Sequence, residues 1–160
     1  KTNVTWLKRA VSRLNQKECT DNPIYPEMVE AYVNAAPSSD AYVFYAGILM
    51  EQGESNKAIE YFNKAIDLET DNYKKAKYYY RVAMIMKKRG SRSESRKYAR
   101  LAIKERPSMG SAYLLISNLY ASSANTCGTD EISKRMVYVA AADKAREAKA
   151  ADPGITSTAN

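Results

Sequence analysis

The residues able to do chemistry in this chain are few, and their types and spacing argue against catalysis. The 160 residues include no histidine, which removes the commonest general base and metal ligand. An enzyme would then need a carboxylate pair, a cysteine or lysine nucleophile, or a bound cofactor. Glu51 and Glu54 flank Gly53 at an expected helix end, and Glu60 and Asp67 lie on an expected exposed face. These positions suit solvated charges, so we expect no enzymatic activity.

Binding motifs for cofactors, metals and membranes are missing from the sequence as well. It contains no glycine-rich phosphate loop, no Gly-x-Ser-x-Gly elbow and no Cys-x-x-Cys pair. We therefore expect neither a cofactor nor a metal site. The longest apolar stretch covers residues 42–50, less than half of a membrane span. We expect no transmembrane segment, and a chain that is either a mature product or a piece of a longer protein.

The elements that carry these residues follow a repeat. Residues 39–72 place aromatic, small and turn-forming residues at fixed positions of a ~34-residue period. These residues are Tyr42, Ala46, Gly53, Ala58, Phe62 and Ala65. The segment closely resembles a tetratricopeptide repeat. Residues 76–109 resemble a second copy through Tyr79, Ala83, Gly90, Ala99, Ala102 and Pro107, with Ser95 in place of the usual alanine.

Both ends of the chain fit the repeat less well. Residues 1–37 resemble a degenerate first helical pair, with Trp6, Leu7, Ala10 and Leu14 at helical spacing. Residues 110–153 resemble a divergent pair with a long inter-helix loop at 122–131, and 154–160 form an expected flexible tail. The predicted fold is all-α, a right-handed tetratricopeptide solenoid of about four helix-turn-helix pairs.

Packing explains why these residue types recur. Ala46 and Ala58 allow the two helices of one pair to approach closely. Gly53 and Gly90 are expected in the left-handed conformation that ends a helix. The tyrosines at repeat positions are predicted to be packing residues; they are Tyr42, Tyr45, Tyr79, Tyr113 and Tyr120.

The resemblance also implies a concave groove lined by the first helix of each pair. Its register assigns partner-binding positions to Val43, Met50, Lys77, Tyr80, Arg81, Met84, Lys87, Lys88, Leu114 and Asn118, with Gly47, Ser111 and Ala121 beside them. Relatives that grip a chaperone's C-terminal carboxylate use Lys and Asn in the first clamp repeat and Asn in the second. This chain has Val43 and Gly47, then Arg81 and Met84, so we expect no such clamp.

Positive charge is concentrated between residues 73 and 107, which hold thirteen Lys and Arg against two acidic residues. This charge fits a solvated helix face, a surface for an acidic protein or envelope partner, or a site for RNA or DNA. The sequence has no base-reading motif, so it argues against nucleic acid. The predicted function is a protein-protein interaction scaffold. The alternative is a basic module that binds an anionic polymer, either nucleic acid or envelope glycan.

Segments near both ends resemble exported tetratricopeptide proteins of Bacteroidota. They read WLKRA and KECTDNPIY, then ERPSMGSAYLLISNLYASSANTCG and VYVAAADKAREAKAADP. The resemblance implies a periplasmic or outer-membrane location and membership of an envelope protein complex. In that oxidising compartment Cys19 and Cys127 could form a disulfide, although three repeat spacings of ~10 Å would separate them. Two separate buried thiols are the other possibility.

Overall fold

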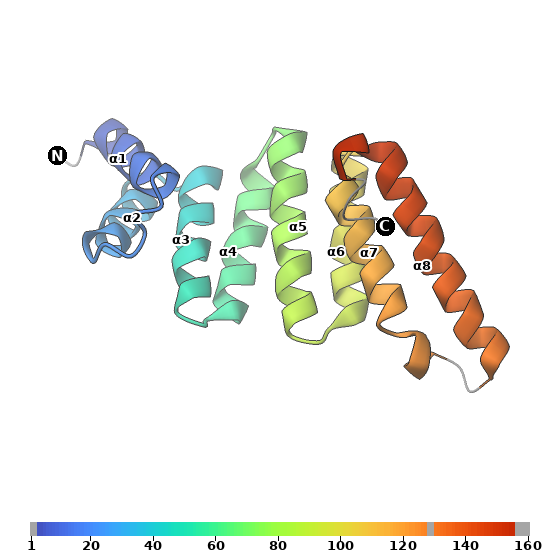
Figure 1. The fold of residues 1–160 in the computed structure, drawn as a ribbon. Coiled ribbons are helices and arrows are strands. Elements are labelled where there is room, and N and C mark those ends of the chain that lie inside the picture. Colours follow the sequence, from blue (N-terminus) through green and yellow to red (C-terminus); the bar gives the residue numbers. More distant parts are fainter. Residues whose placement is uncertain (1–2, 128–129, 156–160) are drawn as a thin grey trace. The chain divides into compact units, whose positions relative to one another are not determined.

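The computed structural model describes residues 3–127 and 130–155, and this part of the chain contains helices and no strand (Figure 1). The helices are α1 (Val4–Gln16), α2 (Ile24–Ala35), α3 (Ser39–Glu51), α4 (Ser55–Leu68), α5 (Asn72–Lys88), α6 (Arg92–Glu105), α7 (Gly110–Ala121) and α8 (Glu131–Ala151). Two short 3-10 helices complete the set, η1 (Ala124–Thr126) and η2 (Pro153–Ile155). The predicted all-α class is confirmed.

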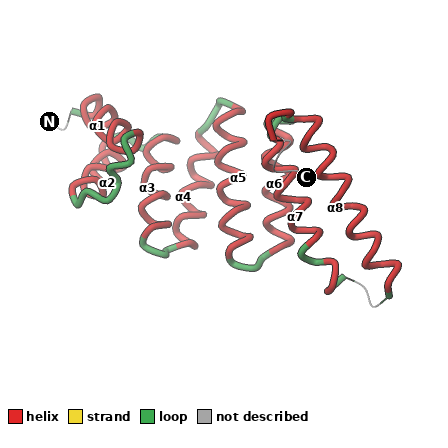
Figure 2. The backbone as a smooth tube through the Cα atoms, in the orientation of Figure 1, coloured by secondary structure: helices red, strands yellow, loops and turns green. Residues whose placement is uncertain are grey.

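The chain forms two compact units, an N-terminal unit of Lys1–Thr70 and a C-terminal unit of Asp71–Asn160. Helix α3 runs antiparallel to α4 in the first unit and α5 runs antiparallel to α6 in the second, and a short turn joins the helices of each pair (Figure 2). Hydrophobic burial explains this pairing, because one amphipathic helix cannot cover its own apolar stripe. None of the described helices combines the length and apolar character that a bilayer span requires.

The core of the N-terminal unit joins α1, α2 and α3. Its buried residues are Leu7, Val11, Tyr25, Val29, Tyr32, Ala41 and Ile48. Two of its tyrosines bury their rings and keep a polar partner: Asn15 Nδ2 donates to Tyr25 Oη at 3.2 Å, and Tyr32 Oη lies 3.3 Å from Ser38 Oγ. Trp6, one of the residues at helical spacing in this pair, is 59 % exposed, whereas Leu7 and Val11 are buried in the core.

The tyrosines predicted to pack are only half-buried. Tyr61 bridges two of them, with ring centroids 5.6 Å from Tyr42 and 4.7 Å from Tyr45. The buried tyrosines are Tyr25, Tyr32 and Tyr78, none of which lies at an expected packing position. The predicted tyrosines therefore pack at the edge of the core and not inside it, as Tyr45, Tyr79 and Tyr120 do against the buried clusters.

Small residues hold the helices of each pair close together. Ala46 and Ala58 are fully buried between α3 and α4. In the next two pairs the corresponding contact carries a hydrogen bond, because Ser95 Oγ donates to Ala83 O and Ser117 Oγ donates to Ala141 O, both at 2.8 Å. The serine belongs to the second helix in one pair and to the first helix in the other. The contact thus tolerates a hydroxyl on either side when a backbone carbonyl accepts it.

A residue with positive φ follows the first helix in three of the helical pairs. Gly53 (φ +78°) and Gly90 (φ +77°) follow α3 and α5, as predicted. Glu54 N donates to Leu49 O, and Ser91 N donates to Met86 O, which satisfies carbonyls that the helix leaves open. Glu18 (φ 55°) adopts the same conformation after α1 without being glycine.

The last pair differs most from a regular repeat. Within the expected loop at 122–131, residues 124–126 form η1, Asp130 caps α8, and positions 128–129 lie outside the described residues. The hydroxyl and backbone N–H of Ser133 donate to the Asp130 carboxylate and hold its pKa below the ordinary value. The expected tail begins within η2, at Gly154 and Ile155, and its remainder, 156–160, lies outside the described part.

Candidate binding groove

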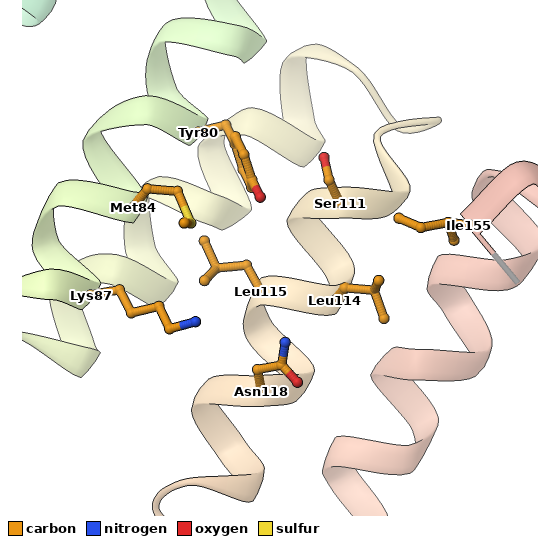
Figure 3. Close-up of a pocket in the computed structure, with 8 residues that line it drawn as sticks. All are labelled: Tyr80, Met84, Lys87, Ser111, Leu114, Leu115, Asn118 and Ile155. Atoms are coloured by element: carbon orange, nitrogen blue, oxygen red, sulfur yellow. The ribbon is translucent and has the colours of Figure 1, made fainter. Parts of the chain in front are cut away.

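A pocket of about 310 Å³ lies between α5 and α7 in the C-terminal unit (Figure 3). Helix α5 contributes Tyr80, Met84 and Lys87, and α7 contributes Ser111, Leu114, Leu115 and Asn118; Ile155 of η2 completes the lining. The two helices are the first helices of consecutive pairs. The pocket therefore lies on the side of the unit where the resemblance places a concave groove.

These side chains are placed by their helical spacing and by helix α6, which packs against both α5 and α7. The pocket residues of α5 are separated by four and three residues, which brings them to one face of the helix. Those of α7 follow the same rule between Ser111 and Asn118. Behind them, Ala83 of α5 and Ala99 of α6 form one buried cluster with Leu115 of α7. Helix α6 thus fixes the separation of the two walls.

The pocket combines an aliphatic floor with polar groups at its edge. Leu115 is 3 % and Leu114 is 9 % exposed, so both are held firmly in the core. In Figure 3 the amine of Lys87 and the amide of Asn118 lie at one end of the pocket, and Ser111 lies at the other. Neither the Lys87 nor the Asn118 side chain has a hydrogen-bond or ion-pair partner within the described part of the chain. Both are available to an external acceptor.

Six residues that the register assigned to the groove or beside it meet in this pocket: Tyr80, Met84, Lys87, Ser111, Leu114 and Asn118. Lys77, Arg81 and Lys88 do not line it and are exposed along α5. Val43 and Met50 lie half-buried on α3, in the N-terminal unit, and their part in a groove stays a prediction.

Sequence reasoning missed two lining residues, Leu115 and Ile155. The apolar spacing of α7 indicates Leu115, since it lies four residues before the buried Leu119. No pattern in the sequence indicates Ile155, which follows Pro153 in a segment without periodicity.

The cysteines and the acidic residues form no second site among the described residues. Cys19 is half-buried, Cys127 is exposed, and both are free thiols in this structure. The expectation of buried thiols is therefore wrong, because both residues lie in turns that follow the first helix of their pairs. A disulfide between them stays a prediction. The described chain has no group of three His, Cys, Asp or Glu residues that could hold a metal ion.

Comparison with known proteins agrees with this architecture. The tetratricopeptide repeat family model matches residues 39–72. A search of curated protein sequences finds no match. Among solved structures, a crystal structure of MamA superposes with a TM-score of 0.69 at 21% identity, over 92% of this chain and 81% of that one.

Two further structures have the same fold. YrrB, described as a TPR protein with an unusual peptide-binding site, gives a TM-score of 0.70 at 15% identity, over 96% of this chain and 71% of that one. A MamA fragment from Desulfovibrio magneticus RS-1 gives 0.68 at 12% identity, covering 96% of this chain and 77% of that one. Residues 39–72 are thus a tetratricopeptide repeat, and the chain has the α-solenoid fold of tetratricopeptide-repeat proteins.

Proposed function

We propose that this chain is a non-catalytic protein-interaction module that binds a segment of a partner protein between α5 and α7. The observation that carries the proposal is the pocket itself, which offers aliphatic walls and two unpartnered polar side chains, Lys87 and Asn118, at one end. A partner's apolar side chain would lose contact with water in this pocket, which favours binding.

The polar groups suit the backbone or side chains of such a segment. A bound segment removes its own carbonyl groups from water, and each of them needs a donor. The ammonium of Lys87 donates, and the amide of Asn118 both donates and accepts. Met84 adds a flexible wall that adapts to side chains of different shape. The peptide-binding site described for the structural neighbour YrrB gives further support to this reading.

The test is to pan a display library of random 12-residue peptides on the full chain and to measure the affinity of enriched peptides by fluorescence anisotropy. Asn118→Trp fills the pocket from an exposed position. We expect this variant to weaken binding at least tenfold. Asn56→Trp, at an exposed position of α4, is the matched control and should bind as the original chain does. The proposal fails if no peptide is enriched, or if Asn118→Trp binds the enriched peptides normally.

A second candidate function is binding of an anionic polymer, such as nucleic acid or envelope glycan. The observation that favours it is the excess of thirteen basic over two acidic residues between 73 and 107, which covers α5 and α6. Affinity for such a polymer falls steeply with salt because bound counterions are released. Titration with single-stranded DNA and with heparin at 50 and 300 mM NaCl tests it. A polymer affinity that exceeds the peptide affinity and is unaffected by Asn118→Trp would favour this candidate.

We also propose a location in the cell envelope of a Bacteroidota species, where the chain would join a complex at the outer membrane. Support comes from the resemblance of both end segments to exported proteins of that group. Fractionation of cells that produce the natural protein, followed by immunoblotting, checks the location. Recovery in the periplasmic or outer-membrane fraction is expected, and recovery with the cytoplasmic proteins alone would contradict it.

A further inference from the structure

Helix α5 carries a row of positive charges that continues from the pocket. Lys77, Arg81 and Lys88 are exposed and lie at spacings of four and seven residues, so they share one side of the helix. Lys87, beside them, reaches the end of the pocket (Figure 3). The row from Lys77 to Lys88 is roughly 17 Å long at the rise of an α-helix.

The two helices that line the pocket supply no opposite charge to the three lysines of this row. Neither α5 (Asn72–Lys88) nor α7 (Gly110–Ala121) contains an acidic residue. Within the described chain, Lys77, Lys87 and Lys88 have no ion-pair partner. Other helices pair their cations locally, as Lys57 with Glu54, Lys97 with Glu94 and Arg146 with Asp143. Lys77, Lys87 and Lys88 therefore present unneutralised positive charge beside the pocket.

We infer that the partner segment is acidic, with one aliphatic side chain in the α5–α7 pocket and carboxylates along Lys77, Arg81, Lys87 and Lys88. This inference rests on the proposed function and adds the chemistry of the partner. An extended peptide advances ~3.3 Å per residue, so about five residues cover the row. A carboxylate at Lys87 would form a charge-assisted hydrogen bond beside the apolar pocket, where water is reduced.

The pocket favours an acidic protein segment over a nucleic acid. Single-stranded nucleic acid binds through bases that stack on aromatic rings. Tyr80 is the one aromatic residue among the pocket residues, and the other apolar walls are the aliphatic side chains of Met84, Leu114, Leu115 and Ile155. Such walls suit Leu, Ile or Met of a partner. A regular polyanion has no apolar side chain to place there.

The experiment pans the full chain against two display libraries of 12-residue peptides that share the same apolar and neutral residues. One library adds Asp and Glu, and the other adds Lys and Arg. We expect binders to come from the acidic library, with affinities that fall at least tenfold between 50 and 300 mM NaCl. If binders come mainly from the basic library, or equally from both, the inference of an acidic partner is wrong, and the proposed function is unaffected. A failure of both libraries overturns the proposed function too.

Charge reversal locates the effect on α5. The double variant Lys77→Glu with Lys88→Glu should bind the acidic peptides at least tenfold more weakly. The matched control, Arg92→Glu with Lys104→Glu, makes the same change in net charge on exposed positions of α6 and should change affinity less than threefold. Equal losses in the two double variants would contradict the inference, because only net charge would then matter. Tighter binding of a 20-nucleotide single strand than of the best acidic peptide, blocked by Asn118→Trp, would assign the pocket to nucleic acid.

Discussion

Two helical glycines differ in what surrounds the place of their missing Cβ. At Gly110, the first residue of α7, a Cβ would lie 2.7 Å from Asp152 Cβ and 3.1 Å from Ala148 O. At Gly47, inside α3, it would meet nothing within 4 Å. Gly110 therefore allows the end of α8 and η2 to lie directly on α7. Because η2 carries Ile155, this close approach also builds one wall of the pocket.

We predict opposite effects for alanine at these two glycines. Gly110→Ala should lower the free energy of unfolding by about 1–3 kcal/mol, because the backbone carbonyl and the short Asp152 side chain must move apart. Gly47→Ala should raise it by roughly 1 kcal/mol through helix propensity. Urea unfolding followed by circular dichroism measures both. A loss for Gly47→Ala as large as that for Gly110→Ala would contradict the role of the close contact.

Glu18 is the non-glycine residue at a left-handed helix end. Its φ of 55° is unfavourable for a residue with a Cβ, whereas Gly53 and Gly90 occupy the same place after α3 and α5. Glu18→Gly should therefore stabilise the N-terminal unit by roughly 0.5–1 kcal/mol, after the larger chain entropy of unfolded glycine is subtracted. The measurement is again urea unfolding, with Gly53→Ala as the reverse control. A lower stability of Glu18→Gly would show that the carboxylate or Cβ has another role.

Residue-level prediction from the sequence succeeded where a position has one physical requirement. Gly53 and Gly90 are needed for positive φ, and Ala46 and Ala58 are needed for close helix contact, so the repeat pattern identified all four. Helical spacing alone did not decide the burial of Trp6, since an apolar residue at that spacing can lie either on the packed face or just beside it.

At the scale of elements, α8 is much longer than the helix it packs against. Its 21 residues span about 31 Å, and the 12 residues of α7 span about 18 Å. The two buried residues of α8, Ala141 and Ala148, belong to its second half. Figure 1 shows the start of α8 extending beyond the end of α7, near η1. Apolar side chains in that first half are exposed: Ile132, Met136, Tyr138 and Val139.

We predict that the two halves of α8 differ in local stability. Amides of residues 134–140 should exchange with deuterium at least tenfold faster than those of 141–150, because opening the first half exposes little new apolar surface. Hydrogen exchange with mass spectrometry resolves the halves. Amides of α6, which packs against both α5 and α7, are the slowly exchanging reference. Equal protection along α8 would mean that its first half has a covering partner in solution.

Element prediction was best where the repeat is regular. Pairing of α3 with α4 and of α5 with α6 follows from residues 39–109 of the sequence. The C-terminal end could not be read in this way. Pro153 indicates a helix end, but the turn of η2 onto α7 depends on the small volume of Gly110, which is a tertiary contact. For this reason six pocket residues were predicted from the register, while Ile155 was not.

At the scale of the whole molecule, the two units carry opposite charge. The N-terminal unit has seven Lys and Arg against ten Asp and Glu, and the C-terminal unit has eighteen against eight. Much of the excess forms like-charge rows. On α6, Arg92, Arg96, Arg100 and Lys104 follow one another at intervals of four residues. Each such neighbouring pair destabilises a helix by about 0.2–0.5 kcal/mol.

Salt should therefore stabilise the C-terminal unit and, at the same time, lower its affinity for the proposed acidic peptide. Between 10 and 150 mM NaCl the Debye length falls from about 30 to about 8 Å, which screens the repulsion along α6. We expect slower hydrogen exchange of α5 and α6 in 150 mM NaCl, whereas α3 and α4 should change little. Arg92→Glu with Lys104→Glu replaces the repulsion at both ends of the row by attraction, so salt should no longer slow the exchange of α6.

The same variant separates stability from binding. Its affinity for acidic peptides should keep the salt dependence of the original chain, because Lys77, Arg81, Lys87 and Lys88 on α5 are unchanged. If the variant loses the salt dependence of both stability and peptide affinity, the positive charge of the unit acts as a diffuse field. If it loses only the effect on stability, two charged rows on neighbouring helices have separate consequences: the α6 row lowers the stability of the unit, and the α5 row selects the partner.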